Sequence, residues 1–193
     1  MIRTKAPVIV IALALLCLPG ACGGTPGASA RTVEALQTTD GTLHAGATLP
    51  VPESRVILTL SGVARPNVGK DLELDLATIQ RMRSTEATVY EPFLKRDIRF
   101  GGVLLSDLLS YAGVDDTGTM AVTALDDHLV TFALGQLDER RVLVATDIEG
   151  RPIQLADGGP SRLIFLDASH GPGSNPDNWI WSLSDMTFET TPS

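Results

Sequence analysis

The spacing of apolar and polar positions predicts mostly short strands after residue 54. The segment RVILTLSG, residues 55–62, places alternate aliphatic side chains on one side, which is typical of a strand that ends at Gly62. Pro92 separates two strand patterns in residues 87–100, and the sequence DDH separates two more in residues 120–134. Apolar runs predict further strands within residues 140–150, 161–168 and 179–190.

Two helices are expected between these strands. LDLATIQRM, residues 74–82, follows a strand-like start and predicts a short helix. In FGGVLLSDLLSYAGV we expect Gly101 and Gly102 to make a turn. A helix then begins near Ser106, and Gly113 ends it in the left-handed conformation. Its buried stripe comprises Leu105, Leu108 and Leu109. Many short strands with few short helices predict a mixed, strand-rich α+β domain over residues 54–191.

The first 21 residues have the layout of a signal peptide. Arg3 and Lys5 precede an apolar run of 11 residues, Val8 to Leu18, and small residues follow. Such a run is too short to span a bilayer as a permanent helix. A buried core helix is the alternative interpretation, which the basic head and the position at residue 1 disfavour. We therefore expect an exported protein.

The end of this segment allows two kinds of cleavage. A standard signal peptidase would cut near Ala21, whereas LPGAC resembles a bacterial lipobox, in which a cysteine is acylated and becomes the first residue. Pro19 stands where that motif prefers an apolar residue such as leucine. From this resemblance we expect Cys22 to be the lipid attachment site. Several acyl chains on this cysteine would anchor the protein firmly. A disulfide is the alternative for Cys22, but its one candidate partner, Cys17, would leave with the signal peptide.

Residues 22–53 are rich in Gly, Thr, Ala and Pro and show no sustained periodicity, which predicts a flexible tether. The anchor would make a membrane the partner of this segment. The expected location is the cell membrane or the outer membrane, facing the periplasm or the cell exterior.

Charge and motifs exclude several classes of function. The net charge is -8, the isoelectric point is near 4.8, and the chain lacks a Lys/Arg run, so nucleic acid is not an expected partner. The sequence has no Gly-rich phosphate loop, G-x-S-x-G elbow or H-E-x-x-H helix. Three acids in DLELD, residues 71–75, are interpreted as a solvated strand face, and Asp126 and Asp127 as turn residues.

The order of four motifs is similar to that of the molybdopterin-binding domain in the sulfite oxidase family. They are F-x-G-V-x-L-x-x-L-L from Phe100, VTALD from Val122, ATDIEGRPIQL from Ala145, and GGPSRLIF from Gly158. The resemblance extends over roughly residues 56–188. It implies a mixed, strand-rich α+β fold of the sulfite oxidase type with a few short helices.

The residues that this family uses for its cofactor are only partly present. The family binds molybdenum through a pyranopterin and one cysteine thiolate, a soft ligand that suits the metal. The corresponding region, residues 85–100, has no cysteine. Asp177 and Ile180 stand where the family has lysines near the cofactor phosphate, whereas Arg162 and Trp181 match family residues. The resemblance therefore implies a retained scaffold, with no metal ligands and no catalytic residue. A cofactor is not expected, and molybdopterin is suggested by the family resemblance alone.

Five residues are candidates for ligand binding. Arg162 is predicted to bind an anion or a partner carboxylate, or alternatively to form a structural salt bridge or to clamp carbonyl groups at its turn. His170 and Asn175 lie in a Gly/Pro/Asn-rich loop of the kind that lines sites, although a solvated loop is the alternative. Trp179 and Trp181 would share one side of a strand, where they line a pocket, rim an interface or pack on the sheet.

The sequence leaves three functional hypotheses. The first is an exported lipoprotein whose domain is a non-catalytic binding or accessory module for a small ligand or an envelope protein. The second is an envelope oxidoreductase that uses molybdopterin or another cofactor. The third is a structural envelope lipoprotein that binds no ligand. The openness and charge of the cavity around Arg162 distinguish these hypotheses.

Overall fold

Two β-sheets and two short α-helices build the body of the protein. The computed structural model describes residues 36–189. The larger sheet has the order β1-β4-β5-β8-β10, with β9 paired to β8. Its strands are all antiparallel and comprise β1 (Gln37–Thr39), β4 (Ser84–Glu91), β5 (Arg96–Leu104), β8 (Val142–Ile148), β9 (Arg151–Pro152) and β10 (Arg162–Phe165).

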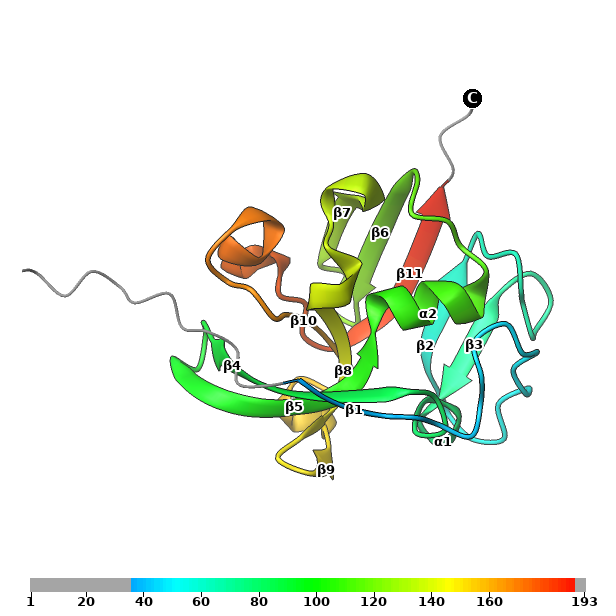
Figure 1. Cartoon of the computed structure of the whole chain (residues 1–193), viewed down its shortest axis with the longest axis horizontal. Helices are drawn as coiled ribbons and strands as arrows, with labels where there is room; N and C mark the ends of the chain where they lie inside the picture. The colour runs from blue at the N-terminus through cyan, green and yellow to red at the C-terminus, as the bar shows by residue number, and fades with distance from the viewer. Residues whose placement is uncertain (1–35, 190–193) are drawn as a thin grey trace, which may run out of the picture.

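The second sheet has the order β3-β2-β11-β6-β7. The pairing of β11 with β2 is parallel and the other pairings are antiparallel. Figure 1 shows this sheet above and to the right of β4 and β5, with α2 in front of the region where the sheets meet. Its strands are β2 (Val56–Ser61), β3 (Leu72–Asp75), β6 (Thr119–Ala124), β7 (Leu129–Ala133) and β11 (Leu183–Glu189).

One hydrophobic cluster joins both sheets and α2. Burial of such aliphatic and aromatic side chains is the main favourable contribution to folding. Its fully buried members include Leu58, Leu60, Phe100, Leu105, Leu108, Met120 and Ile164. The expected strand-rich α+β class is confirmed, because two sheets dominate and the α-helices are short.

The helices are α1 (Leu76–Ile79) and α2 (Leu105–Ala112), and both coincide with predicted helical patterns. In α2 the expected stripe is buried, and Gly113 ends the helix with φ of 68° in the left-handed region. Five short 3₁₀ segments lie in the second half of the chain: η1 (Leu134–Gln136), η2 (Glu139–Arg141), η3 (Leu155–Asp157), η4 (Gly171–Ser174) and η5 (Pro176–Asn178).

The predicted turn at Gly101 and Gly102 is wrong, because both glycines lie inside the nine-residue strand β5. The pairing of β5 with β8 shifts register between them, so that β8 has a bulge at this point. A Cβ on Gly102 would lie 2.1 Å from the carbonyl oxygen of Val144. The glycine therefore allows two backbones to approach closely within a sheet, as glycine in a strand often does.

The interpretation of residues 71–75 as a solvated face is also wrong at Asp75. This residue ends β3, is 2% exposed and caps α1 by accepting a hydrogen bond of 2.8 Å from the Thr78 amide. Its other oxygen accepts from the amides of Glu53 and Ser54 and from the Ser54 hydroxyl. Asp75 therefore fixes α1 and the segment before β2 to the end of β3.

The structure differs from the expected tether over residues 22–53. From Gln37 the chain forms β1 at the edge of the larger sheet, and Leu49 is buried in the core. The predictions for residues 1–35, including the signal peptide, Cys22 and most of the tether, lie outside the described residues. Within residues 36–189, no helix is long and apolar enough to cross a membrane.

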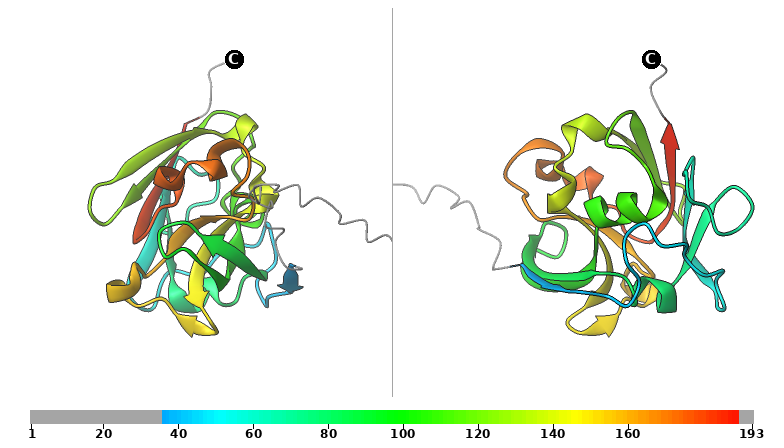
Figure 2. Two further views of the ribbon diagram at one scale, coloured as in Figure 1. Left: turned by 90° about the vertical axis from the view of Figure 1, so that its left-hand side faces the viewer. Right: turned by 45° about the vertical axis from the view of Figure 1, so that its right-hand side comes forward.

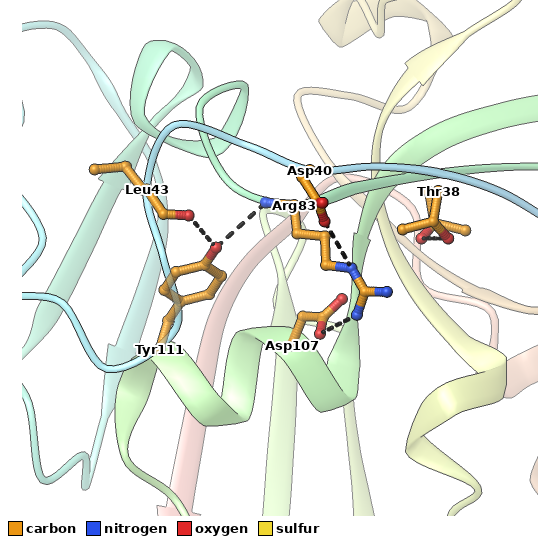
Figure 3. A network of polar contacts seen from close by, with 7 residues as sticks. Thr38, Asp40, Leu43, Arg83, Asp107 and Tyr111 are labelled. Carbon is orange, nitrogen blue, oxygen red and sulfur yellow. Dashed lines mark hydrogen bonds and ion pairs between the residues drawn. The ribbon is translucent and has the colours of Figure 1, made fainter.

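Polar contacts hold the segment after β1 against α2 (Figure 3). The Tyr111 hydroxyl donates to the Leu43 carbonyl oxygen at 2.7 Å and accepts from the Arg83 amide at 3.3 Å. The Arg83 guanidinium lies 3.6 Å from Asp40 and 3.3 Å from Asp107. These contacts explain why residues 40–44 belong to the folded domain rather than to a free linker.

Asp75→Asn tests the buried cap. Hydrogen bonds from the Thr78 side chain hold the pKa of Asp75 well below its ordinary value, against burial that raises it. A lowered pKa makes the carboxylate stabilising above about pH 4, and this contribution is lost as pH falls through the folded-state pKa. Urea unfolding should show that Asp75→Asn lowers the free energy of unfolding by about 2 kcal/mol at pH 7.

The difference between wild type and variant should shrink progressively as pH falls below about 4, since Asp75 then takes up a proton in the unfolded chain while the folded protein still holds it charged. Asp71→Asn, immediately before β3, is the control and should change stability by less than about 0.5 kcal/mol. A constant difference from pH 7 to pH 2 would contradict the role assigned to the Asp75 charge.

Candidate functional site

Arg162 is a buried cation at the start of β10. The residue is 1% exposed, and its guanidinium donates from Nε to the Gly158 carbonyl oxygen at 3.3 Å and from Nη2 to the Asp157 carbonyl oxygen. Burial lowers the pKa of Arg162, while the nearby carboxylates of Glu91 and Asp157 act in the opposite direction. The guanidinium remains charged, since arginine has an ordinary pKa above 12. Arg162 thus clamps carbonyl groups at the turn that precedes it, as one of the two sequence hypotheses predicts.

Trp181 covers this guanidinium. The Arg162 Cζ atom lies 3.8 Å from the Trp181 ring centroid, which is a cation–π contact. Gly158 has φ of 74°, and a Cβ there would lie 2.7 Å from the Trp181 ring and 3.0 Å from Arg162 Nη2. Glycine is therefore required at position 158 both by the backbone conformation and by the stacked pair.

Trp179 and Trp181 do not lie on a strand, which corrects the prediction for residues 179–190. Trp179 follows η5, and β11 begins only at Leu183. Trp179 is 3% exposed, packs on Phe165 with ring centroids 6.1 Å apart, and donates from Nε1 to the Gly173 carbonyl oxygen at 2.9 Å. Both indoles nevertheless line the same pocket, as the pocket hypothesis for them expects.

The tip of the β4–β5 hairpin brings a third aromatic ring to this place. Phe93 is half exposed, and its ring meets Trp181 edge to face with centroids 5.8 Å apart. Glu91 at the end of β4 is fully buried and accepts a hydrogen bond from the Leu94 amide, which closes the hairpin turn. The predicted turn at Pro92 is confirmed, and it determines where Phe93 lies.

Three buried polar atoms in this neighbourhood have no hydrogen-bond partner among the described residues. They are Glu91 Oε1, Arg162 Nη1 and Trp181 Nε1. Buried polar groups in folded proteins are nearly always paired with protein atoms or water. The neighbourhood therefore retains hydrogen-bonding capacity that the protein itself does not use.

A cavity of about 330 Å³ lies beside these groups. Its aromatic walls are Phe93, Trp179 and Trp181, and its polar lining consists of Asp126, His128 and Asp177, with Ala124 completing it. The polar residues come from the β6–β7 turn and from η5, which meet where His128 Nε2 lies 3.2 Å from the Asp177 carbonyl oxygen. Figure 2 shows the η4–η5 segment, in orange, beside the β6–β7 hairpin.

The formal charges on the cavity lining are negative. Asp126 and Asp177 are exposed at its rim, and neither forms an ion pair with any residue that the structure describes. The lining includes no lysine or arginine, because Arg162 lies behind Trp181. In chemical terms this is an aromatic cavity with a carboxylate rim.

His170 and Asn175 do not line this cavity. The His170 side chain is 84% exposed, and its Nδ1 lies 2.6 Å from the Ser169 hydroxyl and 3.8 Å from Asp167 Oδ2. Asn175 caps η5, where its Oδ1 accepts from the Asp177 amide at 3.1 Å. Asn175 therefore shapes the loop that presents Asp177.

Sequence reasoning missed five lining residues: Phe93, Ala124, Asp126, His128 and Asp177. Asp126 and His128 occupy the turn between β6 and β7 and were interpreted only as turn residues. Asp177 was noted only as an acid where a lysine was expected. The sequence does show acids in the turn after β6 and in the segment before the tryptophans, and an aromatic residue next to Pro92. It does not show that these three segments meet in the fold.

Comparisons with known proteins match most of the domain. Residues 50–170 match a family model described as oxidoreductase molybdopterin binding domain. In its crystal structure, the sulfane dehydrogenase SoxCD from Paracoccus pantotrophus superposes with a TM-score of 0.53 at 18% identity, over 69% of this chain and 38% of that chain. This chain thus spans well under half of that structure, and the likeness concerns the fold. No curated protein matches the sequence.

Arg162→Met tests the clamp. This variant removes the donors to two carbonyl oxygens and leaves the Glu91 carboxylate buried without its compensating charge. Removing one partner from buried charges is strongly destabilising, so we expect a loss of about 3 kcal/mol in denaturant unfolding. Arg83→Met, which breaks only half-exposed ion pairs, is the control and should cost less than about 1 kcal/mol.

The variant Glu91→Gln completes a double-mutant cycle. Its amide oxygen still accepts from the Leu94 amide, so the cycle isolates the charge interaction with Arg162. We expect a coupling free energy of about 1 kcal/mol or more, with the double variant more stable than the sum of the two single losses predicts. Additive losses would show that the Glu91 charge does not compensate Arg162.

Proposed function

Because the chain belongs to the oxidoreductase molybdopterin-binding domain family, we propose that it uses this scaffold as a ligand-binding or accessory module and not as a molybdenum enzyme. We further propose that a lipid anchor holds it at the cell envelope. The domain has the sulfite oxidase-type fold of its family. The proposal therefore concerns what the site does and where the protein resides.

The donor set does not fit a molybdenum centre of this family. The chain has two cysteines, Cys17 and Cys22, and none among residues 36–189. The described residues contain no group of three or more His, Cys, Asp or Glu side chains placed to hold a metal ion. Hydroxyl and amide groups do not replace a soft thiolate at such a metal.

The negative charges around the cavity also do not suit the negatively charged phosphate of the cofactor. A pterin that carries a phosphate needs cationic or amide donors, whereas the formal charges around this cavity are the carboxylates of Asp126 and Asp177. Like charges repel, by about 1 kcal/mol or more in a partly dry site. This carboxylate-rimmed aromatic cavity is the observation on which the proposal of a different, non-catalytic binding role rests.

Arg162 does not supply the positive charge that a phosphate in the cavity would need. The family arginine at this position is present, but the guanidinium donates to carbonyl oxygens of its own turn and is covered by Trp181. Only Nη1 remains without a partner among the described residues. In the proposed module Arg162 is a positioning residue for Trp181.

The proposed location rests on the sequence of the first 22 residues. A basic head, an apolar run of 11 residues and the small residues before Cys22 favour export and acylation. A multiply acylated cysteine holds a protein firmly on a membrane, while a single chain binds marginally. The partners proposed are thus a membrane through the anchor, and a small ligand or an envelope protein through the domain.

Elemental analysis tests the absence of a molybdenum centre. The full-length protein is purified from a host that synthesises molybdopterin, with a sulfite oxidase-family enzyme from the same host as the positive control. We expect stoichiometric molybdenum in the control and only background in this protein, and the same result for extracted pterin fluorescence. One molybdenum atom per chain would overturn the proposal.

Cys22→Ser tests the anchor. In the native host, the wild-type protein should sediment with membranes and resist extraction by high salt, since acyl chains rather than charges retain it. The variant should move to the soluble fraction or keep an uncleaved leader. Cys17→Ser serves as the matched control and should behave as wild type. Equal membrane retention of both variants, each with its leader removed, would show that Cys22 is not the anchor.

A further inference from the structure

We infer that the aromatic cavity binds a small organic cation, namely an amine or a quaternary ammonium compound. This inference rests on the proposed function, because it assigns a ligand class to the binding module. The three observations that carry it are the charge of the rim, the aromatic walls and the volume.

The rim selects for positive charge. Asp126 accepts one hydrogen bond, from the His128 amide at 3.3 Å, and the structure gives the Asp177 carboxylate no contact with a cationic side chain among residues 36–189. Both carboxylates are exposed next to the cavity, so a ligand can approach them without displacing an existing ion pair. An ammonium group gains attraction from both, and an anion is repelled by both.

The walls favour a cation that carries apolar groups. Aromatic ring faces attract ammonium and guanidinium groups within about 6 Å of the ring centroid. The protein already uses this attraction, because Arg162 lies over Trp181 at 3.8 Å. Phe93, half exposed at the hairpin tip, lines the cavity and adds a further aromatic ring that a ligand can reach.

The charge of Arg162 does not reverse this selectivity. Its guanidinium lies behind Trp181 and outside the cavity lining, and the buried Glu91 carboxylate acts on it as a compensating charge. The fields of two buried groups of opposite charge partly cancel outside the pair. The field within the cavity is therefore set mainly by Asp126 and Asp177.

The cavity volume sets the size of the ligand. A space of about 330 Å³ is at the lower end of the range for small-molecule sites. It accommodates one ammonium group with a single ring or a short aliphatic body. The unpartnered Trp181 Nε1 is a hydrogen-bond donor on a lining residue, so an acceptor oxygen on the ligand would add specificity.

Three single-ring probes of similar size and different charge test the inference: benzylamine, benzyl alcohol and benzoate. Both tryptophans of the chain line the cavity, so intrinsic fluorescence reports directly on occupancy. We expect a saturable change with benzylamine, at least about tenfold weaker binding of benzyl alcohol, and weaker binding still of benzoate. The benzylamine affinity should fall as salt is raised.

The double variant Asp126→Asn/Asp177→Asn tests which residues select the charge. It should reduce benzylamine affinity by about tenfold and leave benzyl alcohol binding unchanged. Asp115→Asn/Asp116→Asn is the matched control, because it removes the same charge from exposed positions outside the cavity lining. This control should bind benzylamine like the wild type.

Three results would overturn the inference. Two of them are benzoate binding as tightly as benzylamine and the absence of a saturable response to any probe. Equal effects of the two double variants would likewise show that the protein's net charge, and not the rim, is responsible. Molybdenum is measured on the same preparation. A metal-free protein without amine preference contradicts this inference alone, whereas stoichiometric molybdenum contradicts the proposed function itself.

Discussion

The buried guanidinium of Arg162 is the constraint on which the geometry of the candidate site depends. A charge that is 1% exposed is costly unless its surroundings compensate it. Here the compensation comes from three separate parts of the chain: the carbonyl groups of the turn at residues 157–158, the ring of Trp181, and the Glu91 carboxylate at the end of β4. Because each part must be in place, this single cation links the hairpin tip, the start of β10 and the entry to β11.

The fold does not depend on the residues that distinguish a molybdenum site. The core is built from the inner faces of two sheets and from α2, whereas the cavity is formed by turns at the ends of strands. Sites on loops can change while the scaffold beneath them is maintained. This separation explains how a chain without a thiol in the domain still matches the family over residues 50–170.

The local patterns in the sequence predicted most elements because strand and helix periodicities reflect which face is buried. The α2 stripe, the turn at Pro92 and the hairpin around Asp126 follow from neighbouring residues alone. Gly102 was misinterpreted because a tight turn and a crowded strand both require the absence of a Cβ. The contacts of Asp75 with residues 53 and 54, and the meeting of Phe93 with Asp126 and Asp177 around the cavity, could not be predicted, since these partners lie at distant positions and only the tertiary fold brings them together.

The edge strand β1 gives the domain a mechanical property. A pull on the chain before Gln37 acts first on the three residue pairs that join the exposed strand β1 to β4, and next on the contacts of Asp40 with Arg83 and of Leu43 with Tyr111. The buried Leu49 takes the load only after these contacts have separated. Twelve residues, 37–48, would then extend by up to about 40 Å. Tension at the N-terminal edge would thus be met first by contacts to which none of the cavity-lining residues contributes.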